Sequence, residues 1–261
     1  MDNVNKTLYI PLYGKAFVSR KGIILTDKKA EQIWAQEQFA LKGKSKSKWL
    51  AYYMSMRSAV FDAWTKEKIV EFPDAIVLHL GCGLDSRAER VGAHNAVWFD
   101  VDFPAVIDER KRYYKETENY RMLADDIKDG AFIEMLPKSN RAIVILEGVS
   151  MYLANDELRQ LFAKLSARFE NLSVLLDCYT PFAAKMSKIK NPVNDVGVTK
   201  VYGLKGPSVL ETDTGLNFIK ERSMTPNYLI DELTGFERFI FKHLYAGRTS
   251  KGLYKLYEFE K

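Results

Sequence analysis

Carboxylates follow several apolar runs of this sequence, at positions where they could meet a ligand. Asp102 closes the run that begins at Ala96, Asp126 follows a shorter run, and Glu147 directly follows the run AIVIL. Asp102 lies about 20 residues beyond Gly81, the interval typical of a carboxylate that accepts hydrogen bonds from ribose hydroxyls. These acidic groups therefore indicate a site for a ligand that carries a ribose.

A glycine turn, Gly81-Cys82-Gly83, separates an apolar run from a helix-prone segment in AIVLHLGCGLDSRAER. Because glycine has no side chain, the backbone of such a turn can approach a ligand closely. Ser86 stands where the dinucleotide fingerprint G-x-G-x-x-G has its third glycine, so the seat for a pyrophosphate is incomplete. The turn and the acidic run ends together disfavour a nicotinamide oxidoreductase.

Arg57 lies in the middle of an apolar helical stripe in KWLAYYMSMRSAVFDAW. An arginine on an apolar face is costly unless an anion meets it. That anion is either a carboxylate of the ligand or an internal partner, such as Asp62, Glu67 or a carboxylate across the core. The residues alone leave both interpretations open.

S-adenosylmethionine fits this set of groups better than a dinucleotide does. Its sulfonium and α-amino group are positive, it carries a ribose and an adenine, and its one carboxylate needs a cation. Simpler explanations exist for two of the acids: Asp102 could cap the helix that follows Phe103, and Asp126 could belong to a solvated turn. Glu147 is harder to explain in this way, because no basic residue adjoins it.

The apolar runs predict the strands that position these groups. AIVLHLG, AVWFDVD, RAIVILEG and NLSVLLDCY alternate with amphipathic segments between residues 73 and 180, and a further short strand precedes LADDIKD. Strands that are apolar on both faces and separated by helices predict a parallel sheet covered on both sides, which is a doubly wound α/β fold. Ligands of such sheets bind outside the carboxyl ends of the strands, where the acids stand.

Helices are predicted before and between these strands. Residues 1–72 form a helical N-terminal cap that contributes Arg57, with one helix capped by Asp27 and a long helix from about Lys48 to Phe72. The segments PAVIDERKRYY and NDELRQLFAKLSARF are predicted helices within the sheet region. The second of them is expected to open with Asn155 as its N-cap.

The methyltransferase core is expected to span residues 73–261, with an irregular or partly helical insertion at about 181–230. By analogy with the fold, we expect the N-terminal cap and this insertion to close over the pocket as a lid. FERFIFKHLY and KGLYKLYEFE flank AGRTSKG with alternating aromatic positions, which predicts an antiparallel C-terminal hairpin. A reversed last strand is typical of the methyltransferase variant of the fold rather than of nicotinamide-binding domains.

Composition limits the compartment and the partners. The 39 basic and 34 acidic residues give a net charge of +5 that is spread along the chain, so no nucleic-acid partner is expected. The lysine-rich stretch from Lys42 to Lys48 is interpreted as a solvated loop. Two cysteines, Cys82 and Cys178, form no disulfide framework. With no signal pattern and no apolar run near the ~18 residues of a membrane span, we expect a cytoplasmic protein with no membrane partner.

At these residues the sequence resembles the leucine carboxyl methyltransferase family, and within it the bacterial branch of polyketide-type, tetracenomycin-like O-methyltransferases. The resemblance covers most of the chain and includes KTLYIPLYGKA, ADDIKD and LEGVSMYL. LGCGLDSRAER matches the family pattern L-G-x-G-x-D-[ST]-R, and FDVDFPAVIDERK matches F-x-V-D-[FL]-P. The first 48 residues and the insertion match weakly, so the substrate is not carried over.

The resemblance implies a class I S-adenosylmethionine-dependent methyltransferase, with a Rossmann-like, mostly parallel seven-stranded sheet. It implies that Arg57 meets the methionine carboxylate of the cofactor, and that Gly81 and Glu147 hold its amino end. Asp85 and Arg87 also match the motif, and we expect them to fix the shape of the turn.

At the nucleoside end, the resemblance implies that Asp102 binds the ribose and that Asp126, with the backbone of Ile127, reads the adenine edge. His79 is interpreted as a packed core histidine. No metal ligands are predicted. The predicted cofactor-binding residues are Arg57, Gly81, Cys82, Gly83, Asp102, Asp126, Ile127 and Glu147.

The expected activity is methyl transfer from S-adenosylmethionine to a hydroxyl or carboxylate of a small, polyketide-like molecule. The alternatives are a protein carboxyl methyltransferase and a catalytically silent module that binds S-adenosylmethionine and pairs with another chain. A carboxylate acceptor needs no general base, whereas a phenol or alcohol benefits from one. Tyr152 and His243 are candidates for such a base, but neither occurs in a motif that marks it, so no catalytic residue is assigned.

Overall fold

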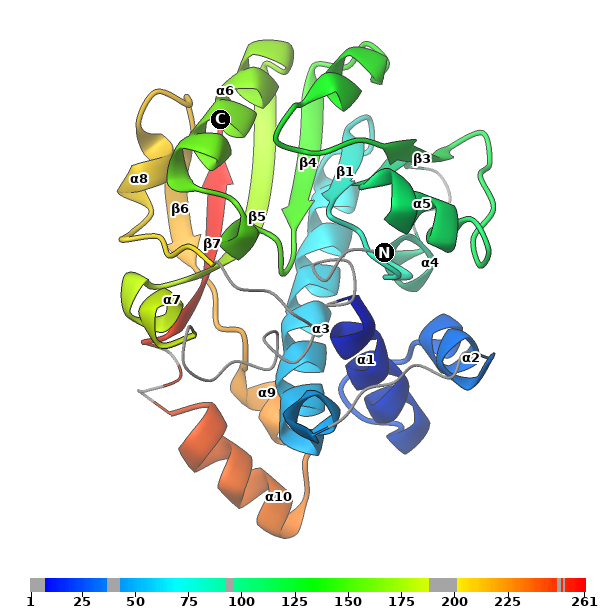
Figure 1. Ribbon diagram of the computed structural model, residues 1–261, viewed down its shortest axis with the longest axis vertical. Coiled ribbons are helices and arrows are strands. Elements are labelled where there is room, and N and C mark those ends of the chain that lie inside the picture. Colours follow the sequence, from blue (N-terminus) through cyan, green and yellow to red (C-terminus); the bar gives the residue numbers. More distant parts are fainter. Residues whose placement is uncertain (1–7, 37–42, 93–95, 188–200, 248–249, 251) are drawn as a thin grey trace.

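Seven strands form one sheet at the centre of the molecule (Figure 1). The computed structural model describes residues 8–36, 43–92, 96–187, 201–247, 250 and 252–261. The strand order across the sheet is β3-β2-β1-β4-β5-β7-β6. In chain order the strands are β1 (Ile76–Leu80), β2 (Val97–Asp102), β3 (Tyr120–Ala124), β4 (Arg141–Leu146), β5 (Asn171–Tyr179), β6 (Asn217–Glu221) and β7 (Tyr254–Glu260).

The first five strands are parallel and the last two reverse. β1 pairs in parallel with β2 and β4, and β4 pairs in parallel with β5, whereas β7 runs antiparallel to both β5 and β6. The parallel core and its antiparallel end are confirmed. Because the chain leaves β1 toward β2 and β3 and returns later to β4, the strand order reverses between β1 and β4. This reversal places the ligand-binding edge at the carboxyl ends of these strands.

Helices cover both faces of the sheet, as the apolar strands predict. In β1, Leu78 packs in the cluster that includes α6 (Asn155–Arg168), while Val77 packs on the opposite face with α3 (Lys48–Glu71). Every residue of β1 is buried. α3 covers its face of the sheet through residues such as Phe61 and Trp64, and its N-terminal half continues past the carboxyl edge toward the site.

Two shorter helices, α1 (Tyr9–Lys21) and α2 (Lys28–Gln36), lie beyond this edge (Figure 1). They share an apolar cluster with Leu84, which follows the glycine turn. The predicted cap of α2 is confirmed, because Asp27 Oδ1 accepts a hydrogen bond from the Ala30 amide at 2.8 Å. The bounds of α3 agree with the predicted helix to within one residue.

The prediction that Asn155 caps α6 is wrong. The N-cap is Ala154, and Asn155 is the first helical residue. The Ala154 amide donates to Glu157 Oε2 at 2.6 Å, so a carboxylate in the first turn reaches back to satisfy the helix end. This half of a capping box removes the need for a polar side chain at the cap itself.

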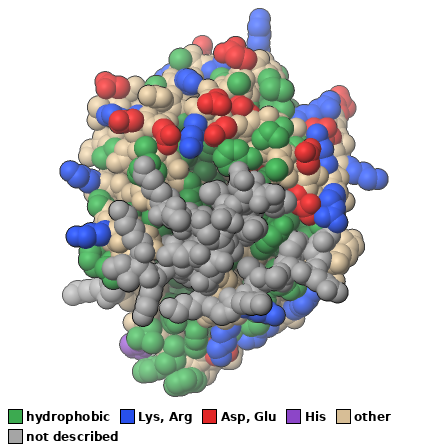
Figure 2. Space-filling model, in the orientation of Figure 1, with side chains coloured by type: hydrophobic (Ala, Val, Ile, Leu, Met, Phe, Trp, Pro, Cys, Tyr) green, Lys and Arg blue, Asp and Glu red, His purple; other side chains and the backbone are tan. Residues whose placement is uncertain are grey.

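The predicted first strand of the C-terminal hairpin is also wrong, because residues 235–245 are helical. They form α10 (Gly235–Ile240) and a π-helical turn, η6 (Phe241–Tyr245). Aromatic residues three to five positions apart fit a helix as well as they fit an alternating strand. Phe236 and Phe239 are exposed on this helix. Figure 2 shows hydrophobic side chains at the lower end of the molecule, where Figure 1 places α10.

The antiparallel partner of β7 is instead β6, which lies inside the region predicted as an insertion. Phe218 of β6 packs edge-on against Tyr257 and Phe259 of β7, with ring centroids 5.6 and 5.8 Å apart. This aromatic contact holds a short, mostly exposed segment at the sheet edge. The insertion also contributes α7 (Pro181–Ser187), α8 (Ser208–Glu211) and α9 (Asn227–Ile230), and its residues 188–200 lie outside the described part.

Several short elements complete the described chain. Lys48 of the lysine-rich stretch pairs with Glu237 of α10 at 2.9 Å, and Lys42 lies outside the described residues. In the described part of the chain, no helix is both long and apolar enough to cross a membrane. The short elements are η2 (Gly43–Lys46), α4 (Arg87–Val91), α5 (Pro104–Arg110), η3 (Ala131–Met135) and η4 (Ser150–Tyr152).

Candidate active site

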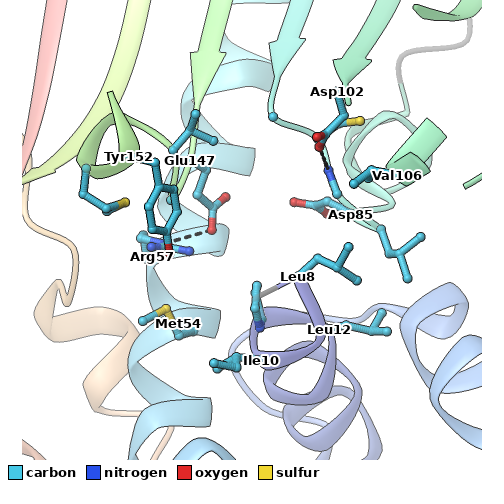
Figure 3. Close-up of a pocket in the computed structure, with 18 of the residues that line it drawn as sticks. Leu8, Ile10, Leu12, Met54, Arg57, Asp85, Asp102, Val106, Glu147 and Tyr152 are labelled. Atoms are coloured by element: carbon cyan, nitrogen blue, oxygen red, sulfur yellow. Dashed lines mark hydrogen bonds and ion pairs between the residues drawn. The ribbon is translucent and has the colours of Figure 1, made fainter. Parts of the chain in front are cut away.

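A cavity of about 1080 Å³ opens at the carboxyl ends of the parallel strands (Figure 3). The turns after β1, β2, β3 and β4 contribute one wall, and α1 and α3 contribute another. All of the residues predicted to bind the cofactor lie on this lining. They are Arg57, Gly81, Cys82, Gly83, Asp102, Asp126, Ile127 and Glu147.

The glycine turn presents bare backbone to the cavity. Gly81 and Gly83 have φ values of 68° and 53°, in the left-handed region that favours glycine. A Cβ atom on Gly81 would lie 2.3 Å from Cγ2 of Val149, so any larger residue would have to displace the Val149 side chain. The Gly81 amide donates to the carbonyl oxygen of Val101 at 2.8 Å, which holds the turn against β2.

Asp102 ends β2 beside this turn. Its Oδ2 accepts from the Gly83 amide and its Oδ1 from the Phe103 amide, each at 2.8 Å. Burial raises the pKa of Asp102 from 3.8 to about 6, and the two amide bonds oppose that rise. The alternative that Asp102 caps α5 is wrong, because the N-cap is Phe103 and no side chain of the described residues caps this helix. The bond from Gly83 instead ties the ends of β1 and β2 together.

The turn after β3 brings Asp126 and Ile127 to the cavity. The neighbouring Asp125 is committed to the backbone of η3, where its Oδ2 accepts an amide bond at 2.7 Å. Asp126 Oδ1 accepts a longer bond of 3.1 Å from the Lys128 amide. Among the described residues, no group bonds to Asp126 Oδ2 and none accepts from the Ile127 amide. An acceptor and a donor thus lie side by side, as recognition of an adenine edge requires.

Glu147 is buried between two arginines at the end of β4. Its Oε1 accepts from Arg57 Nε at 3.0 Å and from Ser58 Oγ at 2.8 Å, and its Oε2 accepts from Arg87. Burial acts to raise the pKa of Glu147, but the two guanidinium groups dominate and lower it to about 2. The carboxylate is therefore ionised at neutral pH and can face a positive group of a ligand.

Arg57 has internal partners, and they are carboxylates across the core. Besides Glu147, its Nη1 donates to Asp177 Oδ2 at 2.8 Å and to Tyr254 Oη at 2.7 Å. Asp62, which is nearer in sequence, pairs with Arg87 and Arg90 and reaches Arg57 only indirectly, through Arg87 and Glu147. Among the described residues nothing accepts from Arg57 Nη2, so one end of the guanidinium remains available at the cavity wall.

Lys15 is a second cation at this wall, and the sequence interpretation missed it. It lies on α1 with a side chain only 4% exposed, and its Nζ is 3.4 Å from Asp85 Oδ2. Its neighbours Leu12 and Ala16 on the same helix are buried. A lysine amid a buried stretch of helix requires an anion nearby, and that was the signal in the sequence.

Asp85, Arg87 and His79 form a buried polar group next to the glycine turn, and Asp85 and His79 also lie on the cavity lining. Asp85 pairs with Arg90 at 2.5 Å, and Arg87 is completely buried with one bond to Glu147. His79 is 2% exposed, and burial lowers its pKa, so the ring is neutral at physiological pH. These positions agree with the predicted structural roles of all three residues.

The remaining part of the cavity is apolar and aromatic. It is built by α3, by β5 and α7, and by the chain that enters β7. Tyr254 stacks on Tyr53 with ring centroids 6.4 Å apart and meets Tyr179 edge-on at 4.8 Å. The lining of this part includes Leu50, Tyr53, Met54, Tyr179, Met186, Tyr245, Leu253 and Tyr254.

Of the two predicted candidates for a general base, only Tyr152 lies on the cavity (Figure 3). His243 is exposed on η6, where its ring packs on Phe239 and its Nδ1 lies 2.8 Å from the Phe239 carbonyl oxygen. His243 is absent from the described lining. His94 lies outside the described residues.

These groups suit a ligand with an amino-acid end and a nucleoside end. Arg57, Lys15 and Glu147 offer two cations and an ionised carboxylate for a zwitterion, while Asp102 and the Asp126-Ile127 turn offer partners for ribose and base. At about 1080 Å³ the cavity lies at the upper end of the ~300–1000 Å³ of small-molecule pockets, and its aromatic part extends beyond these charged groups.

Comparisons with known proteins point to one family. The sequence pattern described as leucine carboxyl methyltransferase matches residues 3–166. The tetracenomycin polyketide synthesis O-methyltransferase TcmP of Streptomyces glaucescens is 27% identical over 92% of this chain and 90% of its own length. The S-adenosyl-L-methionine-dependent methyltransferase dpfgK of Gibberella zeae is 24% identical over 71% of this chain and 67% of its own length.

Solved structures share the fold at much lower identity. The magnesium protoporphyrin IX methyltransferase of Synechocystis, solved with bound S-adenosylhomocysteine, has a TM-score of 0.53 at 12% identity and covers 90% of this chain and 93% of its own. A protein of the duf574 family from Streptomyces avermitilis has a TM-score of 0.58 at 11% identity, over 81% and 84% of the two chains. The seven-stranded sheet with its reversed end is thus a methyltransferase fold.

Proposed function

Because this chain belongs to the leucine carboxyl methyltransferase family and is an S-adenosylmethionine-dependent methyltransferase, we propose that it methylates a hydroxyl or carboxylate oxygen of a small, polyketide-like molecule. The relative from Streptomyces glaucescens is named as an O-methyltransferase of polyketide synthesis. The observation that carries the proposal is a two-part cavity, with charged groups at the strand ends and an aromatic chamber beside them.

We assign the methionine end of the cofactor to the wall formed by Arg57, Lys15, Glu147 and Gly81. The free Nη2 of Arg57 and the Lys15 ammonium suit its carboxylate, and the ionised Glu147 suits its α-amino group. The Gly81 turn, with Cys82 and Gly83, offers backbone that a ligand can approach closely.

We assign the ribose to Asp102, and the adenine to Asp126 and the Ile127 amide. Asp102 holds the turn through one amide bond to each oxygen, and its remaining lone pairs can accept from ribose hydroxyls. The open Oδ2 of Asp126 can accept from the adenine amino group while the Ile127 amide donates to the ring.

The aromatic chamber supports an acceptor that is small and largely apolar. Tyr53, Tyr179 and Tyr254 present ring surfaces, and Met54 and Met186 are unbranched side chains that adapt to irregular shapes. Flat aromatic molecules match such walls better than a peptide does, because a peptide backbone needs hydrogen-bonding partners.

The residues of this chain hold the cofactor and the acceptor in position and form no covalent bond with either. When bound, S-adenosylmethionine supplies a methyl group on a positively charged sulfur that leaves readily. The glycine turn and the two cations fix one end of the reacting pair, the tyrosine walls orient the other, and burial excludes water. A carboxylate acceptor would need nothing more, whereas a hydroxyl acceptor needs a group to take its proton.

The proposal is tested by transfer of labelled methyl from S-adenosylmethionine to 2-naphthol, 2-naphthoic acid and a peptide with a C-terminal leucine. We expect label on at least one naphthalene compound and none on the peptide. Alkali-labile label on the peptide would instead establish a protein carboxyl methyltransferase. Binding of S-adenosylhomocysteine without any transfer would establish the catalytically silent module.

A further inference from the structure

A tyrosine and a buried carboxylate form a pair at the acceptor chamber, beyond the groups assigned to the cofactor. Tyr254 opens β7 and Asp177 lies on the neighbouring β5, and the Tyr254 hydroxyl donates to Asp177 Oδ2. Tyr254 is on the cavity lining, whereas Asp177 has no exposed surface and is absent from that lining. Asp177 therefore reaches the chamber only through its hydrogen bond with Tyr254, among the described residues.

Asp177 is held in one orientation by three donors. Its Oδ1 accepts from the Gly148 amide at 2.7 Å, and its Oδ2 accepts from Arg57 Nη1 at 2.8 Å as well as from Tyr254. Burial raises the pKa of Asp177, against the opposing effect of Arg57. A buried aspartate with a raised pKa accepts a proton more readily than one in water.

The Tyr254 oxygen retains one lone pair for a ligand. It accepts from Arg57 Nη1 at 2.7 Å and donates its proton to Asp177, which leaves one of its two acceptor positions without a described donor. The same Arg57 guanidinium carries the Nη2 assigned to the methionine carboxylate. The sulfonium is joined to that carboxylate through a short carbon chain, so an acceptor oxygen aligned with the methyl group lies close to Tyr254.

Resting on the proposed function, we propose that Tyr254 is a catalytic residue that takes the proton of a hydroxyl acceptor and relays it to Asp177. The acceptor oxygen forms its bond to the methyl carbon while the bond from sulfur to that carbon breaks, and its electron pair stays on sulfur. The acceptor proton moves to Tyr254 Oη as the original Tyr254 proton moves to Asp177 Oδ2. The chain is thereby adapted to a phenol or alcohol rather than to a carboxylate.

The local charge balance supports the same choice. Glu147 and Asp177 both pair with Arg57, and Glu147 also pairs with Arg87, so two carboxylates already balance two guanidinium groups and a carboxylate acceptor would add a third negative group beside them. A neutral hydroxyl adds none, and moving its proton to Asp177 leaves no new anion in the protein. The titratable groups that face the pair are Arg57 and Tyr53 from α3, Glu147 after β4 and Tyr179 from β5.

The test compares two phenols of nearly equal shape, 2-naphthol and the more acidic 6-cyano-2-naphthol, with the wild-type protein and Tyr254→Phe. For 2-naphthol we expect kcat of the variant to fall about 10²-fold or more, with KM changed less than about threefold. For 6-cyano-2-naphthol the loss is smaller, because that phenol ionises without help. Tyr257→Phe on the same strand, whose ring lies outside the cavity lining, is the matched control and keeps wild-type rates.

A second measurement uses only the wild-type protein, so it stands even if the variant does not fold. We expect kcat for 2-naphthol to fall as the pH is lowered. Asp177 is then already protonated, so it cannot accept the proton that Tyr254 passes on. Equal losses with both phenols in Tyr254→Phe, or a flat acid limb in the wild type, overturn the relay. The relay is also overturned if the protein binds S-adenosylhomocysteine but methylates neither phenol, whereas absence of that binding overturns the proposed function itself.

Discussion

Asp102 accepts a hydrogen bond from the Gly83 amide at 2.8 Å, so the carboxylate at the end of β2 is tied directly to the turn at the end of β1. The same carboxylate is half-buried beside the cavity, and loss of solvent raises its pKa to about 6. A single side chain thus fixes the shape of the glycine turn and offers acceptors to a ligand. A charge that costs stability at this place is consistent with the ribose-binding role that we propose for Asp102.

Asp102→Asn is expected to weaken binding of S-adenosylhomocysteine about tenfold or more, because the charged acceptor for the ribose is lost. The same variant is expected to change the stability without ligand at pH 8 by less than about 1 kcal/mol, because loss of the charge and loss of one amide acceptor oppose each other. The pKa of Asp102 is raised on folding, so the ionised carboxylate costs stability as pH rises from 3.8 through about 6, whereas the asparagine amide nitrogen cannot accept the backbone N–H that one carboxylate oxygen accepts. Calorimetric titration and urea unfolding check the two effects.

The affinity of the wild-type protein for S-adenosylhomocysteine should also fall below about pH 6, where Asp102 becomes protonated. Asp102→Asn should remove that part of the pH dependence. Asp108→Asn, an exposed position on α5, serves as control and should bind like the wild type. An unchanged affinity of Asp102→Asn would contradict the assignment of the ribose.

Gly81→Ala is expected to lower both the stability and the affinity for S-adenosylhomocysteine. The new Cβ would meet Val149 at 2.3 Å in addition to the strain of a positive φ. Gly92→Ala is the matched control, since Gly92 has φ 70° and a Cβ added there would have no other atom within 4 Å. That control should lose about 1 kcal/mol of stability from backbone strain alone and keep its affinity. Equal affinities of the two variants would contradict a role for the Gly81 turn in binding.

Lys15→Met is expected to weaken S-adenosylhomocysteine binding about tenfold while leaving the affinity for methylthioadenosine unchanged. Methylthioadenosine has the nucleoside but lacks the amino-acid end, so it reports on Asp102 and Asp126 without using Lys15. Titration of the variant with both ligands measures the difference. Equal losses for the two ligands would show that Lys15 acts through the fold rather than through the methionine carboxylate.

Arg57→Met is expected to reduce stability by about 3–5 kcal/mol, because it leaves the buried Asp177 without its cation and Glu147 with Arg87 alone. Urea unfolding at neutral pH measures this loss. The double variant Arg57→Met with Asp177→Asn should recover part of it, because one uncompensated charge is removed. A double variant less stable than the sum of the single changes would contradict this view of the network.

Much of the sheet and its binding edge could be predicted from the sequence. The buried strands appear as continuous apolar runs, because both of their faces are covered, and β5 matches the run NLSVLLDCY from end to end. The cap of α2 by Asp27 and the bounds of α3 follow from local side chains. These features depend on residues close together in the chain, so they can be predicted from the sequence.

The misses concern contacts between distant segments. The pattern of residues 236–245 fits both a strand and a helix, and only packing of Phe241 in the core decides between them. β6 is too short and polar for its sequence pattern to predict a strand. Its position at the sheet edge depends on contacts of Phe218 with aromatic rings of β7. The partner Asp177 of Arg57 lies 120 positions away in the chain, beyond what spacing can indicate.

The most direct test of the account is a crystal structure of the protein with S-adenosylhomocysteine. We predict that its ribose hydroxyls contact Asp102, that its carboxylate contacts Arg57 or Lys15, and that its sulfur faces the chamber lined by Tyr254. A ligand bound elsewhere, or bound in this cavity with its ribose away from Asp102, would contradict the account.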